Sequence, residues 1–107
     1  MTDGSETLEA IRDAIVKATS PKRIILFGSH ARGTPRQASD WDLLVIVDTD
    51  RPSWEVGIEA RLAAMVVRAP MDLIVLTPRE YDEEIGWSSG IVAHAVRTGK
   101  VIYEAEG

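Results

Sequence analysis

The chain has 107 residues, of which 45% are hydrophobic and 27% charged, so we expect residues 1–107 to form a single globular domain. The absence of cysteine excludes a disulfide framework, a cysteine-ligated zinc site and a thiol nucleophile. The net charge of −5 argues against stable binding of nucleic acid. The N-terminal residues show no signal pattern and the apolar runs are too short to span a membrane, so we expect a cytoplasmic protein.

Hydrophobic spacing predicts helices alternating with strands along the chain. We expect helices from residue 5 or 7 to residue 20, then at 29–33, 55–68, 78–85 and 88–97, and strands at 23–27, 41–47, 71–76 and 101–103. The run 41–47, WDLLVIV, is almost continuously apolar after Asp42, as in a strand covered on both faces. The order of elements predicts an α/β (α+β) fold, with a small mixed β-sheet flanked by helices.

The first chemical feature is a Gly28–Ser29 pair at the point where a strand ends and a short helical turn begins. A glycine allows close approach of the backbone to a ligand, and a helix N-terminus offers N–H groups to a phosphate. Arg32 and Arg36 could add positive charge nearby. Most such pairs are only turns and caps, so the pair alone is a weak indication of phosphate binding.

The second feature is a set of aspartates at the beginnings of two strands. Asp40 and Asp42 should point to the same side of their strand, with Cα atoms about 6.5 Å apart, where they could share a magnesium ion. If the strand at 71–76 lies beside them, Asp72 can reach the same cluster. The alternative is that all three are solvated carboxylates at strand ends.

Together these residues read GSHARGTPRQASDWDLLVIV, and PMDLIVL follows later. The spacing GS-x10-D-x-D, with Gly33, Ser39 and Leu43 also at pattern positions, resembles the nucleotidyltransferase superfamily of the DNA polymerase β type. In particular, the chain is similar to the minimal nucleotidyltransferases that act as antitoxins of HEPN-domain toxins. The motif covers residues 24–47, and the third aspartate extends it to residue 76.

The resemblance implies a polymerase β-like fold and a two-magnesium site. In this family the glycine–serine turn holds the triphosphate of ATP, two carboxylates bind two Mg²⁺ ions, and a third joins the metal site and helps to activate the acceptor hydroxyl. Carried over residue by residue, the nucleotide-binding residues are Gly28, Ser29, Arg32 and Ser39, and the catalytic, metal-binding residues are Asp40, Asp42 and Asp72.

The resemblance also implies an activity and a partner. The reaction transfers AMP from ATP to a hydroxyl, here expected to be a tyrosine of a partner HEPN toxin, with which the chain could form a hetero-oligomer. One alternative is a catalytically silent antitoxin that neutralises its toxin by direct binding, although the three intact carboxylates argue against it. A small-molecule transferase is a third hypothesis, but such relatives generally carry a helical second domain.

Several aromatic residues stand outside the motif's chemistry. Trp41 lies between two aspartates that share a face, so it should point to the opposite side and pack under a helix. We interpret His30 as a solvated residue on the first turn, with contact to a phosphate or base as the alternative. Trp54, Tyr81 and Trp87 should belong to the core or to a partner surface.

Overall fold

Helices and strands alternate around one four-stranded sheet in the computed structural model, which describes residues 4–33, 40–86 and 90–106. The helices are α1 (Gly4–Thr19), α2 (Gly28–Arg32), α3 (Ser53–Ala64), α4 (Pro78–Ile85) and α5 (Ile91–Thr98), and the strands are β1 (Arg23–Phe27), β2 (Trp41–Ile46), β3 (Met71–Leu76) and β4 (Lys100–Glu104).

The sheet has the strand order β3-β2-β1-β4, with β2 and β3 parallel and β1 antiparallel to both of its neighbours. The parallel pair is joined by α3, as a crossover connection requires. The predicted mixed sheet is therefore confirmed. The strand predicted at 71–76 lies directly beside β2, which is the condition on which a shared carboxylate site depended.

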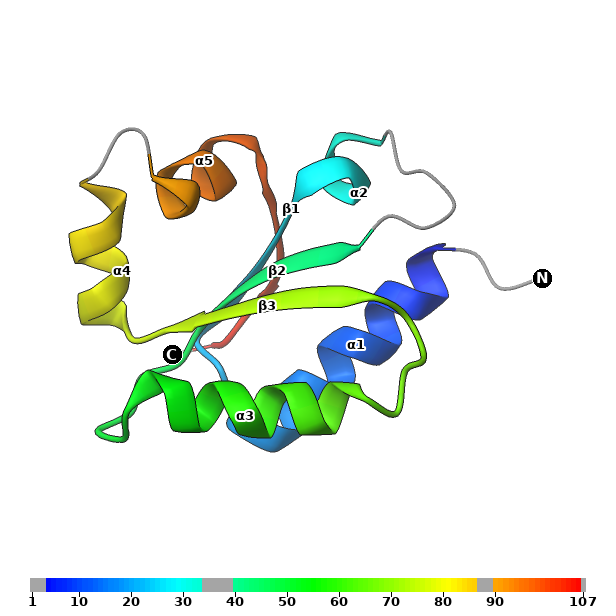
Figure 1. The fold of residues 1–107 in the computed structure, drawn as a ribbon, viewed down its shortest axis with the longest axis horizontal. Coiled ribbons are helices and arrows are strands. Elements are labelled where there is room, and N and C mark those ends of the chain that lie inside the picture. The colour runs from blue at the N-terminus through cyan, green and yellow to red at the C-terminus, as the bar shows by residue number, and fades with distance from the viewer. Residues whose placement is uncertain (1–3, 34–39, 87–89, 107) are drawn as a thin grey trace.

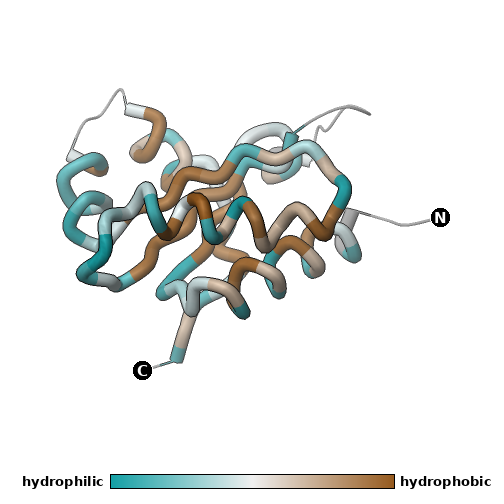
Figure 2. The backbone as a smooth tube through the Cα atoms, turned by 60° about the horizontal axis from the view of Figure 1, so that its bottom comes forward, coloured by the Kyte–Doolittle hydropathy of each residue, from teal (hydrophilic) through white to brown (hydrophobic). Residues whose placement is uncertain are grey.

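Helices cover both faces of the sheet. In Figure 1, α1 and α3 lie together on one side, α4 and α5 lie on the other, and α2 follows the end of β1. The core divides in the same way, because side chains of a strand alternate between faces. Leu43 and Val45 of β2 pack with α1 and α3, whereas Leu44 packs with Val92 and Ala95 of α5. Figure 2 shows the hydrophobic strands at the centre and a hydrophilic α4 at one end.

The structure changes the expectation for the helix predicted at 55–68. Helix α3 begins at Ser53 and ends at Ala64, four residues before the expected end. After Ala64 the chain forms a turn, in which the N–H of Val67 donates to the carbonyl of Ala64, before it reaches Pro70. Small residues form its buried side. An apolar stripe runs along α3 and the turn after it, but it faces solvent; its members are Trp54, Ile58, Leu62, Met65 and Val66, at 48–79% exposure.

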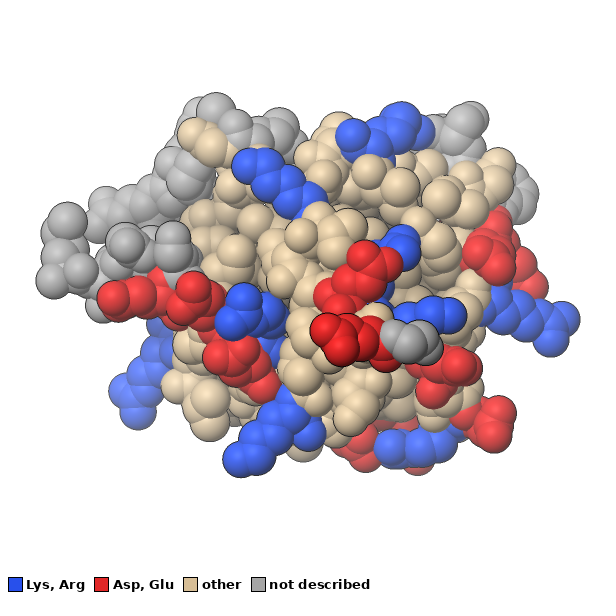
Figure 3. Space-filling view, turned by 180° about the vertical axis from the view of Figure 1, so that it is seen from behind, with Lys and Arg blue, Asp and Glu red and all other residues tan. Residues whose placement is uncertain are grey.

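Other boundaries differ by only a few residues from the sequence-based expectations. The helix predicted at 88–97 begins at Ile91, because its N-cap Gly90 is extended, and it ends at Thr98; residues 87–89 lie outside the described part of the chain. Within the described ranges, no helix is both long enough and apolar enough to cross a bilayer. Seen from behind, acidic and basic side chains are interspersed over the described surface (Figure 3).

Candidate active site

The parallel pairing of β2 and β3 brings two of the predicted carboxylates together. Asp42 and Asp72 are register partners on adjacent strands, so their side chains leave the sheet on the same face. Adjacent strands are about 4.8 Å apart, a spacing from which two carboxylates can hold one cation. Asp42 is half-buried and Asp72 is exposed. The face is the one covered by α5, because alternation places Asp42 with Leu44.

Gly28 lies against the Asp42 carboxylate of this pair. It follows β1 directly and has φ +77°, a left-handed conformation that side chains rarely adopt. A Cβ placed on Gly28 would collide with Oδ2 of Asp42 and lie 3.1 Å from its Cγ. The space that a side chain would fill is therefore taken by the Asp42 carboxylate, so the turn and the carboxylate strand form one site.

The turn itself is the five-residue helix α2. Its N-cap, Phe27, makes no side-chain capping hydrogen bond, and its first turn contains no acidic residue. Ser29, the second residue, is half-exposed. The N-terminus of a helix carries partial positive charge and can bind an anion, so the place suits the phosphate-binding role of Gly28 and Ser29, which stays a prediction.

Other predicted site residues are placed less completely. Ser39 and Arg36 lie in the segment 34–39, outside the described residues, and the side chain of Arg32 is likewise not described. Asp40 is exposed and precedes the first residue of β2. Among the described residues, no three His, Asp or Glu side chains lie close enough to hold one metal ion. The predicted set of three carboxylates is thus not gathered into one cluster, and its metal-binding role stays a prediction.

The carboxylate oxygens of Asp40, Asp42 and Asp72 are nevertheless ligands of the kind that magnesium prefers. Carboxylates are the hard ligands that Mg²⁺ takes together with phosphate oxygens. Because anionic carboxylates repel one another, a cation is what would draw Asp40 toward the Asp42–Asp72 pair. The exposure of Asp40 and Asp72 leaves both side chains room to move toward an ion.

The structure also shows a contact that sequence reasoning missed. The rings of His30 and Trp41 are stacked, with centroids 3.6 Å apart and an angle of 9° between their planes. Trp41 is buried among side chains from α1 and α3, so its predicted orientation, opposite to the aspartates, is confirmed. The interpretation of His30 as a solvated residue is wrong, because its ring is half-buried against Trp41. No spacing rule could indicate a contact made only when β1 and β2 pair.

Residues 9–106 match the family described as "Polymerase beta, Nucleotidyltransferase", so the chain belongs to this family of nucleotidyltransferases. It is 31% identical over 114 residues to the protein adenylyltransferase MntA of Aphanizomenon flos-aquae, in an alignment that covers all of this chain and 75% of the relative.

Two solved structures have the same fold. The first is from a crystal structure of a toxin–antitoxin with AMP-PNP, with a TM-score of 0.59, 23% identity, and coverage of 92% of this chain and 74% of that one. The second is a nucleotidyltransferase-fold protein from Sulfolobus solfataricus, with a TM-score of 0.58, 20% identity, and coverage of 97% and 92%. These likenesses confirm the predicted polymerase β-like fold.

Proposed function

We propose that this nucleotidyltransferase is a protein adenylyltransferase that transfers AMP from ATP to a tyrosine hydroxyl of a partner HEPN toxin and so acts as its antitoxin. The observation that carries the proposal is the register pairing of Asp42 with Asp72, beside a Gly28 turn into which the Asp42 carboxylate packs. The similarity to MntA supports a protein as the acceptor.

In the proposed mechanism, Gly28 and Ser29 receive the triphosphate, and Asp40, Asp42 and Asp72 would hold two magnesium ions. When bound, magnesium neutralises the triphosphate and stabilises the attacking and leaving oxygens. Asp72 also accepts the proton of the acceptor hydroxyl, for which its exposed position at the edge of the sheet is suitable. The acceptor oxygen then bonds to the α-phosphorus, the bond from that phosphorus to the bridging oxygen breaks, and pyrophosphate leaves.

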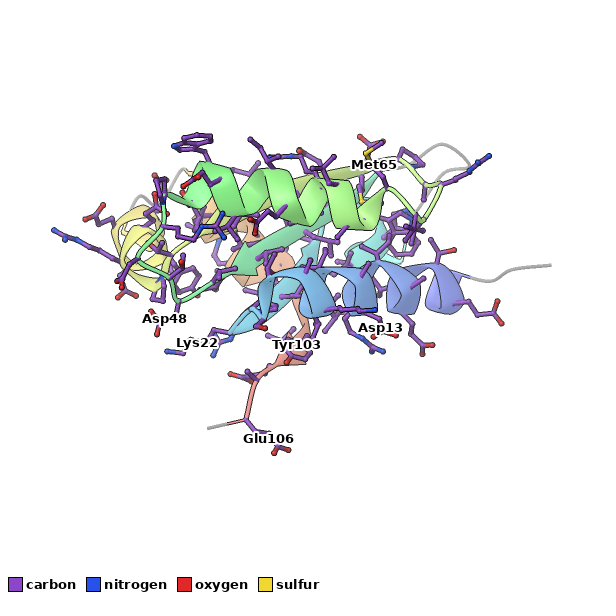
Figure 4. The ribbon with its side chains drawn as sticks, turned by 90° about the horizontal axis from the view of Figure 1, so that it is seen from below. Asp13, Lys22, Asp48, Met65, Tyr103 and Glu106 are labelled. Carbon is purple, nitrogen blue, oxygen red and sulfur yellow. The ribbon has the colours of Figure 1, made fainter. Side chains whose placement is uncertain are left out.

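The apolar stripe on α3 supports a protein partner. Contiguous exposed apolar patches of a few hundred Å² often mark interaction sites. Two hollows lie between α3 and the edge strand β3; one is lined by Trp54, Arg61 and Asp72 among others, and the second by Arg61, Met65 and others. Met65 lies at the end of α3 on the side turned away from α1 (Figure 4). A partner seated on the stripe would therefore reach the edge that carries Asp72.

The alternative function is a catalytically silent antitoxin that blocks its toxin by contact alone. The α3 stripe favours this function as well, because it would serve a steric inhibitor equally well. The two functions differ in whether neutralisation of the toxin depends on the carboxylates.

One experiment separates them. The chain is incubated with Mg²⁺, ATP labelled at the α-phosphate and a HEPN-domain protein from the same genome, and the label is located by mass spectrometry. We expect labelled tyrosine in the partner, no label after addition of EDTA, and none with Asp42→Ala or Asp72→Ala. The matched control is Asp48→Ala, an exposed aspartate just beyond β2, which should label normally. Neutralisation that survives Asp42→Ala without label would support the silent antitoxin instead.

A further inference from the structure

The stack of His30 on Trp41 joins the two halves of the site. His30 follows Ser29 of the candidate phosphate-binding turn, and Trp41 stands between Asp40 and Asp42. One ring contact, at 3.6 Å between centroids, therefore connects the turn to the strand that carries the carboxylates.

Helix α2 depends on such contacts for its orientation. It has five residues, far fewer than the roughly 12–15 that an isolated helix needs in water. Ala31 is buried in the core, and His30 rests on Trp41. Trp41 is 8% exposed and packs with core residues of β2, α1 and α3, so its ring is a fixed surface for the histidine.

Contacts between α2 and β2 include one on each face of the strand, as side-chain alternation requires. Gly28 meets the Asp42 carboxylate on the α5 side, whereas His30 meets Trp41 on the side of α1 and α3. Because they lie on opposite faces of β2, these contacts add to the burial of Ala31 in restraining rotation of the short helix.

We propose that His30 and Trp41 are positioning residues whose stacked rings hold the Gly28–Ser29 turn in register with Asp42, so that bound triphosphate meets the carboxylates in a productive geometry. This inference rests on the proposed nucleotide site. It assigns no chemistry to the histidine itself, since flatness of the ring is the property that matters. Another flat ring should therefore replace it.

The test measures the affinity for AMP-PNP in the presence of Mg²⁺, by calorimetry on the full chain. We expect His30→Leu, which has no ring, to raise Kd about three- to tenfold, as for loss of an aromatic contact. His30→Phe should stay within about twofold of the wild type, because it keeps a stacking ring. The control is Val16→Ala in α1, which removes apolar packing against the core without touching the turn, and which should leave Kd unchanged.

A second readout reports on the stack directly. In a chain whose Trp54 and Trp87 are replaced by phenylalanine, Trp41 is the remaining tryptophan of the sequence. The emission of Trp41 should differ between His30 and His30→Leu chains, since a stacked imidazole alters the excited state of the indole. Identical emission would show that the rings do not stack, and would overturn the proposal.

The outcomes separate this inference from the proposed function. An unchanged Kd in His30→Leu, or equal losses in His30→Leu and His30→Phe, or an equal loss in Val16→Ala, would each overturn the positioning role. Failure to label a protein partner while AMP-PNP still binds would overturn the proposed acceptor but leave the stack intact. If the wild type did not bind AMP-PNP at all, both would be wrong.

Discussion

At the scale of single residues, two glycines with left-handed backbone conformations bracket α2 but are required for different reasons. Gly28 and Gly33 have φ of +77° and +73°. A Cβ on Gly28 would meet the Asp42 carboxylate, whereas a Cβ on Gly33 would meet no described atom within 4 Å. Both positions therefore favour glycine because of their positive φ. Gly28 must in addition lack a Cβ, because the Asp42 carboxylate occupies that space.

Replacement of Gly28 by alanine should consequently damage both stability and activity. We expect a loss of about 1–3 kcal/mol in the free energy of unfolding, from positive φ and from displacement of Asp42. The rate of AMP transfer should fall at least about tenfold, because the carboxylate and the turn move apart. Urea unfolding and the labelling assay measure the two effects.

Gly33→Ala is the matched control for this change. It has the same backbone cost, about 1 kcal/mol, but no carboxylate to displace, so AMP transfer should remain near the wild-type rate. Equal losses of activity in the two variants would show that backbone strain, rather than the contact with Asp42, governs the site.

At the scale of elements, α4 has the most complete local stabilisation. Thr77 precedes it as N-cap and accepts from the N–H of Glu80, while the Glu80 carboxylate accepts from the N–H of Thr77 at 2.9 Å. The hydroxyl of Ser53, the first residue of α3, donates to the same carboxylate at 3.1 Å, so Glu80 also links α4 to α3. The backbone hydrogen bond from Thr77 is the main reason why the pKa of Glu80 lies below its usual value.

This capping box predicts a pH-dependent contribution to stability. A lowered pKa in the folded state means that the stabilisation is complete above the unfolded pKa of about 4.3 and is lost as the pH falls through the folded value. Thermal unfolding of wild type and Glu80→Ala should differ by about 1 kcal/mol at pH 7, and the difference should shrink below pH 4. Glu83→Ala, an exposed neighbour on α4, is the control and should show no such convergence. A difference that stayed constant down to pH 3 would contradict this role of the Glu80 charge.

At the scale of the whole molecule, apolar side chains fall into two groups with different purposes. Leu43 is fully buried between the sheet and the helices α1 and α3, whereas Leu62 is 61% exposed on the α3 stripe. Because burial of apolar side chains drives folding, replacement of Leu43 should lower the free energy of unfolding. Replacement of Leu62 should affect only association with a partner.

Leu43→Ala should cost about 2–5 kcal/mol in the free energy of unfolding, because it opens a cavity in the core. Leu62→Gln should change that free energy by less than about 0.5 kcal/mol. It should nevertheless reduce labelling of the partner, while the affinity for AMP-PNP stays the same. If Leu62→Gln labelled the partner as fast as the wild type, the α3 stripe would not be the docking surface.

The sequence by itself determined the helix–strand order and the candidate site residues. Strand 71–76 is predictable because its apolar run is local and is ended by proline on either side. Gly28, Ser29 and the three aspartates are recognisable because their spacing along the chain is itself the motif. The direction in which Trp41 points also follows locally, from alternation along a strand.

Only the tertiary structure decided which of these residues meet. The register that pairs Asp42 with Asp72, the packing of Asp42 against Gly28 and the stack of His30 on Trp41 all join separate segments. The tertiary structure also decided that the α3 stripe is exposed, because helical spacing predicts an apolar face but not what packs against that face. The physical reason is that a chain's local preferences select its elements, whereas contacts between distant segments are selected by how the whole core packs.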